Sequence, residues 1–224
     1  MQRVVSLTPL NPVSESLIPV VLFAYIVVVI MVTRKLFRYM RRLNLKENVA
    51  IYYNRKLIHI LTGGIVAFLV PYLFTSPLIP TLFALALALI LYFPYKKKSL
   101  LGWFQVSDNT YEVNFCVAWA ASLFSVWLLT RNPFYAVVPP LFMSIGDGVT
   151  GIIRNTIYGK RTKSWLGNLG MLLVTLPIGL HYANIQGAVA SVAATIVEHF
   201  ELPPVLDDNV LIAITSSLIL IALS

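Results

Sequence analysis

Long apolar runs, separated by short polar connections, occupy most of the 224 residues. A helix needs about 20 mainly apolar residues to cross the hydrocarbon core of a bilayer. The pattern predicts spans at 17–33, 57–74, 78–94, 112–130, 134–150, 168–183, 185–199 and 210–223. The apolar character of the seventh span is reduced by Gln186, Ser191, Thr195 and Glu198. We therefore expect an all-α integral membrane protein, a bundle of about seven or eight transmembrane helices.

Composition agrees with this pattern. The chain is 58% hydrophobic and 12% charged, about half the charge of a typical soluble domain. We expect a single transmembrane domain over 1–224, because the predicted spans leave no room for a soluble catalytic module. Residues 1–16 are polar and lack a signal-peptide pattern. The single Cys116 excludes a disulfide within the chain.

Positive charge is concentrated in alternate connections. Of the 17 Lys and Arg residues, 15 fall in 34–56, 95–111 and 151–167. Short loops rich in Lys and Arg stay in the cytoplasm. This distribution predicts a multi-pass protein with an outer polar N-terminus (1–16) and a basic cytoplasmic loop (34–56). It also explains the net charge of +8 without a nucleic-acid partner. The membrane would be the plasma membrane in a prokaryote and the endoplasmic reticulum in a eukaryote.

Acidic residues mark the sharpest candidate site. Asp147, between Gly146 and Gly148, lies at the end of an apolar run, and an acid at the centre of a span costs about 2.5–3.5 kcal/mol on insertion scales. We interpret Asp147 as functional. Glu198 ends the seventh run, and Asp207-Asp208-Asn209 opens the eighth. These oxygen donors suit Mg²⁺, although Asp207 and Asp208 could equally cap a helix.

Two further motifs lie at predicted helix ends. Arg55, Lys56 and His59 enter the second run, with Arg55 and His59 four residues apart on one helix face. Glu112 stands four residues after Asp108 at the start of the fourth run. The alternative interpretations are membrane anchoring for the basic motif and an N-terminal cap for Asp108.

A polar segment follows Asp147. It supplies compact charges and turn residues suited to phosphate: Arg154, Gly159, Lys160, Lys163 and Ser164. The spacing of a Walker A loop is absent, and topology-setting charge accounts for the segment equally well.

These motifs, in their order along the chain, resemble the CTP-dependent polyprenol kinase family, which includes dolichol, phytol and farnesol kinases. The matching residues are Arg55-Lys56-x-x-His59 with Gly63, Glu112, Gly146-Asp147, Gly159-Lys160, Lys163-Ser164-x-x-Gly167, and Glu198 followed by Asp207-Asp208-Asn209. Arg154 is displaced from the family's position, and Asn168 replaces a serine.

The resemblance implies phosphoryl transfer from CTP, with Mg²⁺, to the hydroxyl of a long-chain isoprenoid alcohol. The implied catalytic residues are Asp147, Glu112 and Asp208. The implied metal ligands are Asp147, Asp207, Asp208 and Glu198. The implied nucleotide and phosphate contacts are Arg55, Lys56, His59, Gly146, Arg154, Gly159, Lys160, Lys163, Ser164 and Asn209. The apolar tail would enter laterally between helices, with its hydroxyl at the polar layer on the cytoplasmic face.

Two alternatives stay open. The nearer is a CTP-dependent cytidylyltransferase that makes a CDP-lipid from phosphatidate or archaetidic acid. The other is a small membrane transporter, which would place polar residues at mid-bilayer in several spans. A CDP-alcohol phosphotransferase is excluded, because residues 151–175 contain no aspartate. The sequence does not define the oligomeric state.

Overall fold

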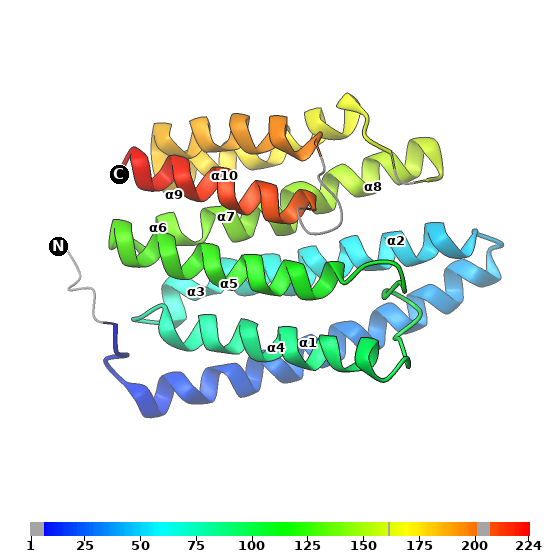
Figure 1. Cartoon of the computed structure of the whole chain (residues 1–224), viewed down its shortest axis with the longest axis horizontal. Helices are drawn as coiled ribbons and strands as arrows, with labels where there is room; N and C mark the ends of the chain where they lie inside the picture. Colours follow the sequence, from blue (N-terminus) through cyan, green and yellow to red (C-terminus); the bar gives the residue numbers. More distant parts are fainter. Residues whose placement is uncertain (1–6, 161, 201–206) are drawn as a thin grey trace.

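A computed structural model describes residues 7–160, 162–200 and 207–224. Within those ranges the protein is all helical, with the helix axes along the long dimension of the molecule (Figure 1). The elements are α1 (Pro12–Arg42), α2 (Glu47–Ile58), η1 (His59–Gly64), α3 (Ile65–Leu73), α4 (Leu78–Lys96), α5 (Tyr111–Thr130), α6 (Pro133–Ala136), α7 (Val138–Leu141), η2 (Phe142–Gly146), α8 (Asp147–Tyr158), α9 (Trp165–Glu198) and α10 (Asp208–Ala222).

Six helical stretches in the described chain are long and apolar enough to cross a membrane. They are α1, Glu47–Leu73, α4, α5, Pro133–Tyr158 and α9, and the shorter apolar helix α10 accompanies them. Many of the large apolar side chains of α1 and α4 are exposed, as expected for surfaces that face lipid. The protein is therefore an all-α membrane bundle.

The helix α9 folds back on itself. Ala183 and Asn184 leave helical geometry, and Asn184 has a φ of 49°. The hydroxyls of Thr175 and Ser191 are 2.7 Å apart, whereas 16 residues of straight helix would separate them by about 24 Å. The two arms of α9 are thus antiparallel, and the predicted break between 168–183 and 185–199 is confirmed. Counting the arms separately, with α10, gives eight apolar segments.

Two π-helical turns interrupt the spans that carry the predicted site. The first, η1, joins α2 to α3, and the second, η2, lies directly before Asp147. The two turns contact each other in the middle of the bundle. Such wide turns are rare and occur often at functional sites.

The segment predicted as a basic loop, 34–56, is mostly helical. Helix α1 continues to Arg42 and α2 begins at Glu47, so the connection covers only 43–46. Lys and Arg are good helix formers, and exposed cations such as Arg38 let the helix project beyond the apolar band. Towards the other end of the segment, Arg55 and Lys56 are buried in the bundle. Of the predicted outer N-terminus 1–16, α1 already includes residues from Pro12 onwards, and 1–6 lie outside the described residues.

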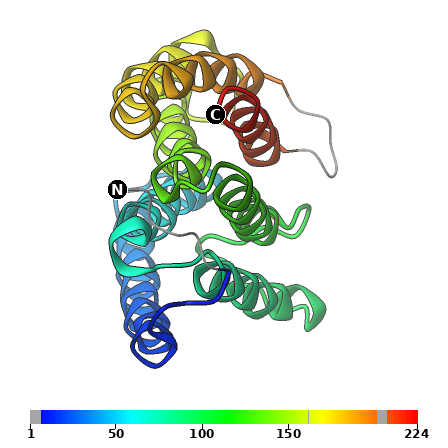
Figure 2. The same ribbon diagram turned by 90° about the vertical axis from the view of Figure 1, so that its left-hand side faces the viewer.

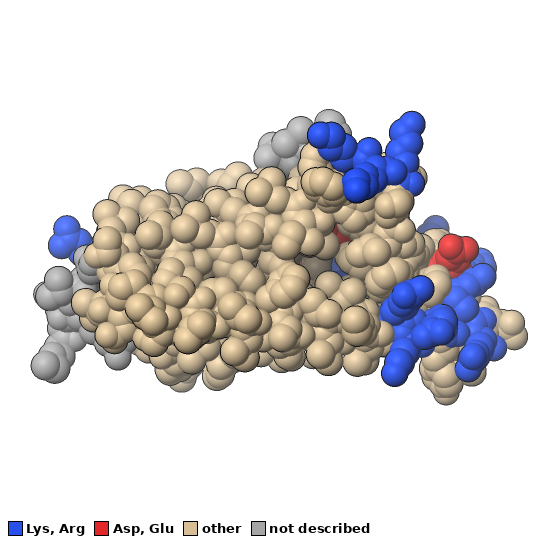
Figure 3. Space-filling model, turned by 90° about the horizontal axis from the view of Figure 1, so that it is seen from below, with Lys and Arg blue, Asp and Glu red and all other residues tan. Residues whose placement is uncertain are grey.

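Charge is segregated along the bundle. Most of the basic side chains in view gather at one end of the molecule, and the long middle part of this face is almost free of charge (Figure 3). The start of α1 and the end of α10 lie at the opposite end, and Figure 2 looks along the helices from there. Arg131, which caps the C-terminus of α5, also lies away from the basic clusters. This arrangement brings the connections of the predicted site together at the basic end.

Candidate functional site

Three buried carboxylates from three parts of the chain converge near the basic end. Asp147 begins α8, Glu198 ends α9, and Asp208 begins α10. One carboxylate oxygen from each lies within 4.8 Å of the other two. Their residues are 1%, 0% and 5% exposed. Carboxylates that lie so close together and are so fully buried need compensating positive charge.

The first compensating cation is Lys56 of α2. Its Nζ donates to both oxygens of Asp147, at 2.7 and 2.6 Å. Lys56 is 3% exposed, and its side chain lies against Gly151, where an added Cβ would lie 2.3 Å from Lys56 Cε. The absence of a side chain at this position of α8 therefore lets the lysine stem pass.

The second is Arg154 of α8. Its guanidinium donates to both oxygens of Glu198, at 2.7 and 2.8 Å, a bidentate geometry available to arginine but not to lysine. It also donates to the carbonyl of Ser164 and to Oδ1 of Asn168. Asn168 in turn donates to Glu198 at 3.1 Å. This network fixes one carboxylate by several hydrogen bonds.

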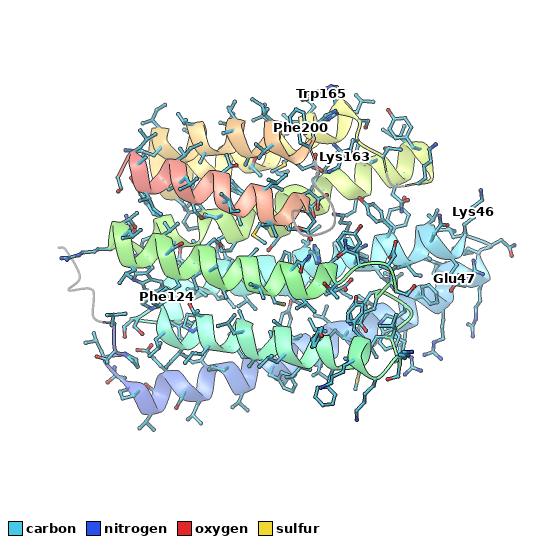
Figure 4. The ribbon with its side chains drawn as sticks, viewed as in Figure 1. Lys46, Glu47, Phe124, Lys163, Trp165 and Phe200 are labelled. Carbon is cyan, nitrogen blue, oxygen red and sulfur yellow. The ribbon has the colours of Figure 1, made fainter. Side chains whose placement is uncertain are left out.

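The third is Lys163, in the connection between α8 and α9. Its Nζ donates to Glu198 Oε1 at 3.2 Å and to Asp208 Oδ2 at 3.1 Å. The side chain is 23% exposed, unlike Lys56 and Arg154. Figure 4 shows Lys163 near Trp165 and Phe200, beside the start of α10. Lys163 therefore forms the part of the cluster nearest to solvent.

Three acids and three cations thus form one network, which we call the carboxylate cluster: Asp147, Glu198, Asp208, Lys56, Arg154 and Lys163. All of its anionic donors are carboxylate oxygens, the ligands that Mg²⁺ prefers. Magnesium is usually bound through one or two carboxylates together with phosphates and water. The donor set fits such an ion, with Lys163 able to turn from the carboxylates to a phosphate.

A separate ion pair contains Glu112. Arg55 Nε lies 3.1 Å from Glu112 Oε1, and the hydroxyl of Tyr95 donates to Oε2 at 2.6 Å. The Arg55 guanidinium also lies 4.2 Å from the centre of the Tyr111 ring. The structure therefore places Glu112 in a balanced pair outside the group of three converging carboxylates.

His59 lies next to the carboxylate cluster. Its Nδ1 is 3.8 Å from Asp147 Oδ2, and its ring stacks on Phe115 at 4.1 Å. Neither ring nitrogen has a hydrogen-bond partner among the described residues. A buried imidazole without such a partner is costly, which makes His59 a candidate for contact with a ligand.

Asp207 differs from the expected metal ligand. Its Oδ1 accepts from the Val210 backbone at 3.1 Å and caps α10, while Oδ2 accepts from Asn114 at 3.2 Å. Consecutive residues at a helix start point in different directions, so Asp208 reaches the other acids and Asp207 is used as a cap. Burial, together with the charge of Asp208, raises the pKa of Asp207 to about 6.

The remaining predicted residues play varied parts. Gly159 ends α8 in the left-handed conformation, with a φ of 61°. Lys160, after it, is exposed. Ser164 contributes its backbone carbonyl, and Gly146 lies in η2 beside Asp147. Asn209 donates to Asp208 at 3.4 Å, and its own Oδ1 is buried without a hydrogen-bond partner in the described chain.

Sequence reasoning missed several supporting residues. Asn168 orients Glu198 and Arg154, Tyr95 holds Glu112, and Asn114 holds Asp207. The available signal was a lone amide or hydroxyl within an apolar run, which needs a partner wherever it is buried. Comparison of the chain with protein-family models, with curated proteins and with solved structures gives no match in any of the three.

Proposed function

We propose that the protein is a membrane-embedded lipid kinase that transfers a phosphoryl group from CTP to the hydroxyl of a long-chain isoprenoid alcohol. The observation that carries the proposal is the convergence of Asp147, Glu198 and Asp208 within 4.8 Å. These acids lie at the basic end of an apolar bundle, where a nucleotide from water and a lipid from the bilayer can meet. Enzymes of phosphoryl transfer act mainly by positioning and by stabilising charge.

Magnesium would be held by Asp147, Glu198 and Asp208. When bound, such an ion neutralises the charge on the phosphates and orients them. The chain's own residues prepare these ligands: Lys56 and Arg154 hold the carboxylates of Asp147 and Glu198 in place. That preorganisation is typical of metal sites, where partners beyond the ligands set their orientation.

Cations would bind the phosphates. Lys163 is the partly exposed cation of the carboxylate cluster, and its ammonium can contact the triphosphate while α8 and α9 hold its backbone. Lys160 is exposed four residues before Ser164 and could approach from solvent. Arg55 sits deeper, paired with Glu112.

In the proposed reaction the lipid hydroxyl oxygen bonds to the γ-phosphorus of CTP, and the bond from that phosphorus to the β–γ bridging oxygen breaks. CDP leaves, and the hydroxyl proton would pass to the carboxylate of Asp147 or Asp208. The products are CDP and an isoprenoid monophosphate. The reaction would take place on the cytoplasmic face.

The test uses purified protein in detergent or nanodiscs. Labelled CTP and ATP would be supplied with farnesol, geranylgeraniol, dolichol or diacylglycerol, and the lipid product analysed. CDP with a lipid monophosphate supports the proposal. Pyrophosphate with a CDP-lipid would instead identify a cytidylyltransferase, and uptake into sealed vesicles without chemical change would identify a transporter; either result would refute the kinase.

A further inference from the structure

A cavity of ≈ 220 Å³ opens between α1 and α4 and ends at η1 and α5. We call it the α1/α4 chamber. Its lipid-facing part is lined by Phe23, Val27 and Ile90, of which Phe23 is 40% and Ile90 52% exposed. The mouth therefore opens onto the apolar surface that faces the bilayer.

The inner end of the α1/α4 chamber is polar. His59 and Glu112 are part of its wall, and they are only 3% and 4% exposed. Figure 3, seen from the side of α1 and α4, shows a hollow in the uncharged surface with acidic and basic atoms at its base. The chamber is thus amphipathic, with an apolar mouth and a polar floor.

The floor has unused hydrogen-bonding capacity. Neither nitrogen of His59 has a hydrogen-bond partner within the described residues, although the ring is fixed on Phe115. Its Nδ1 side faces Asp147, 3.8 Å away. A hydroxyl at this floor would satisfy the imidazole and would lie next to the carboxylate cluster.

The chamber is long enough for the first part of an extended tail. Its lining runs from Phe23 to Ile30 on α1 and from Leu87 to Pro94 on α4. Seven residues of helix correspond to about 10 Å. This groove follows the helix axes, so a chain lying in it would run roughly parallel to the lipid tails of the bilayer.

We propose that the α1/α4 chamber is the binding site of the lipid alcohol, with the tail between α1 and α4 and the hydroxyl hydrogen-bonded to His59. This inference deepens the proposed function, on which it rests for the identity of the lipid. A larger groove of ≈ 590 Å³ between α5 and α10 is the competing location. Its wall includes Asn114 but not His59, and the three converging acids are outside the lining of both cavities.

Photo-crosslinking tests the location without nucleotide. A geranylgeraniol analogue with a diazirine on the tail is irradiated with the purified full chain, and labelled peptides are mapped. Labelling of α1 and α4 that unlabelled geranylgeraniol suppresses supports the proposal. Suppressible labelling of α5 and α10 overturns it, and so does labelling of all lipid-facing helices that the competitor leaves unchanged.

Two neighbouring residues of α1 provide a matched pair of variants. Val27 lines the chamber, whereas Val28 is 57% exposed on the lipid surface. Val27→Trp should raise the geranylgeraniol concentration needed for half-suppression by about tenfold or more, because the indole fills the space for the tail. Val28→Trp should leave it unchanged. Equal effects of the two variants would overturn the assignment.

A second competition experiment tests whether the site recognises the hydroxyl group. The same competition is run with geranylgeraniol and with the matching hydrocarbon that lacks the hydroxyl. The alcohol should compete more strongly in the native chain, and His59→Phe, which keeps an aromatic ring against Phe115, should remove that advantage. An advantage that survives in His59→Phe would refute the hydroxyl contact. These binding experiments contain no nucleotide. If geranylgeraniol binds in the α1/α4 chamber but the kinase assay gives no product, the proposed function is rejected and the binding site is not.

Discussion

The carboxylate cluster and the Arg55–Glu112 pair are both buried, charged and near the basic end, yet they differ in composition. In the cluster three acids from α8, α9 and α10 lie within 4.8 Å of one another. In the pair a single acid meets one guanidinium and the hydroxyl of Tyr95. The cluster concentrates negative charge that would repel without its cations, whereas the pair balances itself.

This difference distinguishes a candidate metal-binding site from an ion pair that only stabilises the fold. Bringing like charges together in a dry interior is costly, and oxygen donors gathered in this way are suited to a divalent cation. A one-to-one pair needs no further ligand. We therefore expect substitutions in the cluster to change chemistry, and substitutions in the pair to have smaller effects.

The largest effect is expected for Asp147→Asn. The substitution removes a converging carboxylate and leaves Lys56 facing a neutral amide. Kinase activity should fall at least about 100-fold, since even partners one step beyond a metal ligand are worth about 10–100-fold. The assay is lipid phosphate formation from labelled CTP. The control is Asp108→Asn, at an exposed acid in the connection between α4 and α5. Equal activity in the two variants would reject the carboxylate cluster as the site.

Arg154→Met should be the most destabilising change. It leaves Glu198, which is 0% exposed, without its bidentate partner, and breaking a buried pair in this way costs about 3–5 kcal/mol. Thermal denaturation in detergent would measure the loss. The control is Arg38→Met, at an exposed arginine, which should have the same melting temperature as the unsubstituted chain. An unchanged melting temperature for Arg154→Met would show that the Arg154–Glu198 pair does not stabilise the fold.

Gly151→Ala is expected to act through Lys56. The new methyl would lie 2.3 Å from Lys56 Cε, so the lysine must move away from Asp147. Overpacking of this kind costs about 1–3 kcal/mol, and we expect activity to fall by about tenfold. Gly102→Ala, where no atom lies within 4 Å of the added carbon, serves as the matched substitution. If both variants kept full activity, the position of Lys56 would be unimportant.

Glu112→Gln should have a smaller effect. The amide retains an oxygen for Arg55, and its geometry still accommodates Tyr95. We expect less than about a tenfold loss of activity, because net hydrogen-bond contributions are about 1 kcal/mol. Kinetic comparison with Asp147→Asn provides the measurement. A loss as large as that of Asp147→Asn would move Glu112 into the catalytic machinery.

The last prediction concerns the dependence of stability on pH. Burial and the charge of Asp208 raise the pKa of Asp207 to about 6, above the ordinary value near 3.9. The folded chain then binds more protons at Asp207 between those two values, so the contribution of Asp207 to stability falls as the pH rises from about 4 to 6 and is constant above it. The decrease would be on the order of 1–3 kcal/mol, because one pKa unit corresponds to about 1.4 kcal/mol.

Asp207→Asn should abolish that decrease while keeping the cap on α10. Melting temperatures of both proteins would be recorded from pH 4 to 7 in a chelating buffer. Parallel curves for the two proteins would show that Asp207 does not titrate in this range.

Prediction from the sequence worked best where one residue was anomalous in its own surroundings. Asp147 was conspicuous because an acid between glycines interrupts an apolar run, and the structure places it in the carboxylate cluster. Asp207 and Asp208 could not be distinguished, since adjacent acids look alike until the helix start fixes their directions. Asn168 was overlooked because its importance depends on Glu198, which lies 30 residues away.

The predicted spans show the same limit. The predicted spans included a break between 183 and 185, although the apolar pattern after it is diluted by Gln186, and the contact of Thr175 with Ser191 confirms that break. The basic segment 34–56 was wrong as a loop, because the charge pattern that orients a chain does not report where a helix ends. The π-helical turns η1 and η2 were not predicted as such, although each ends in glycine, at Gly64 and at Gly146.

The residue pattern was sufficient to predict the all-α membrane class, the separation of charge towards one end, and the acids available for a site. These properties depend on the free energy of transferring apolar and charged side chains between water and lipid. That free energy is a property of each residue and does not require knowledge of its neighbours in space. Tertiary structure alone decided that Asp147, Glu198 and Asp208 meet, that Asp207 caps α10, and that Glu112 pairs with Arg55. Those outcomes depend on distances between helices far apart in the chain, and only the packing of the helices fixes these distances.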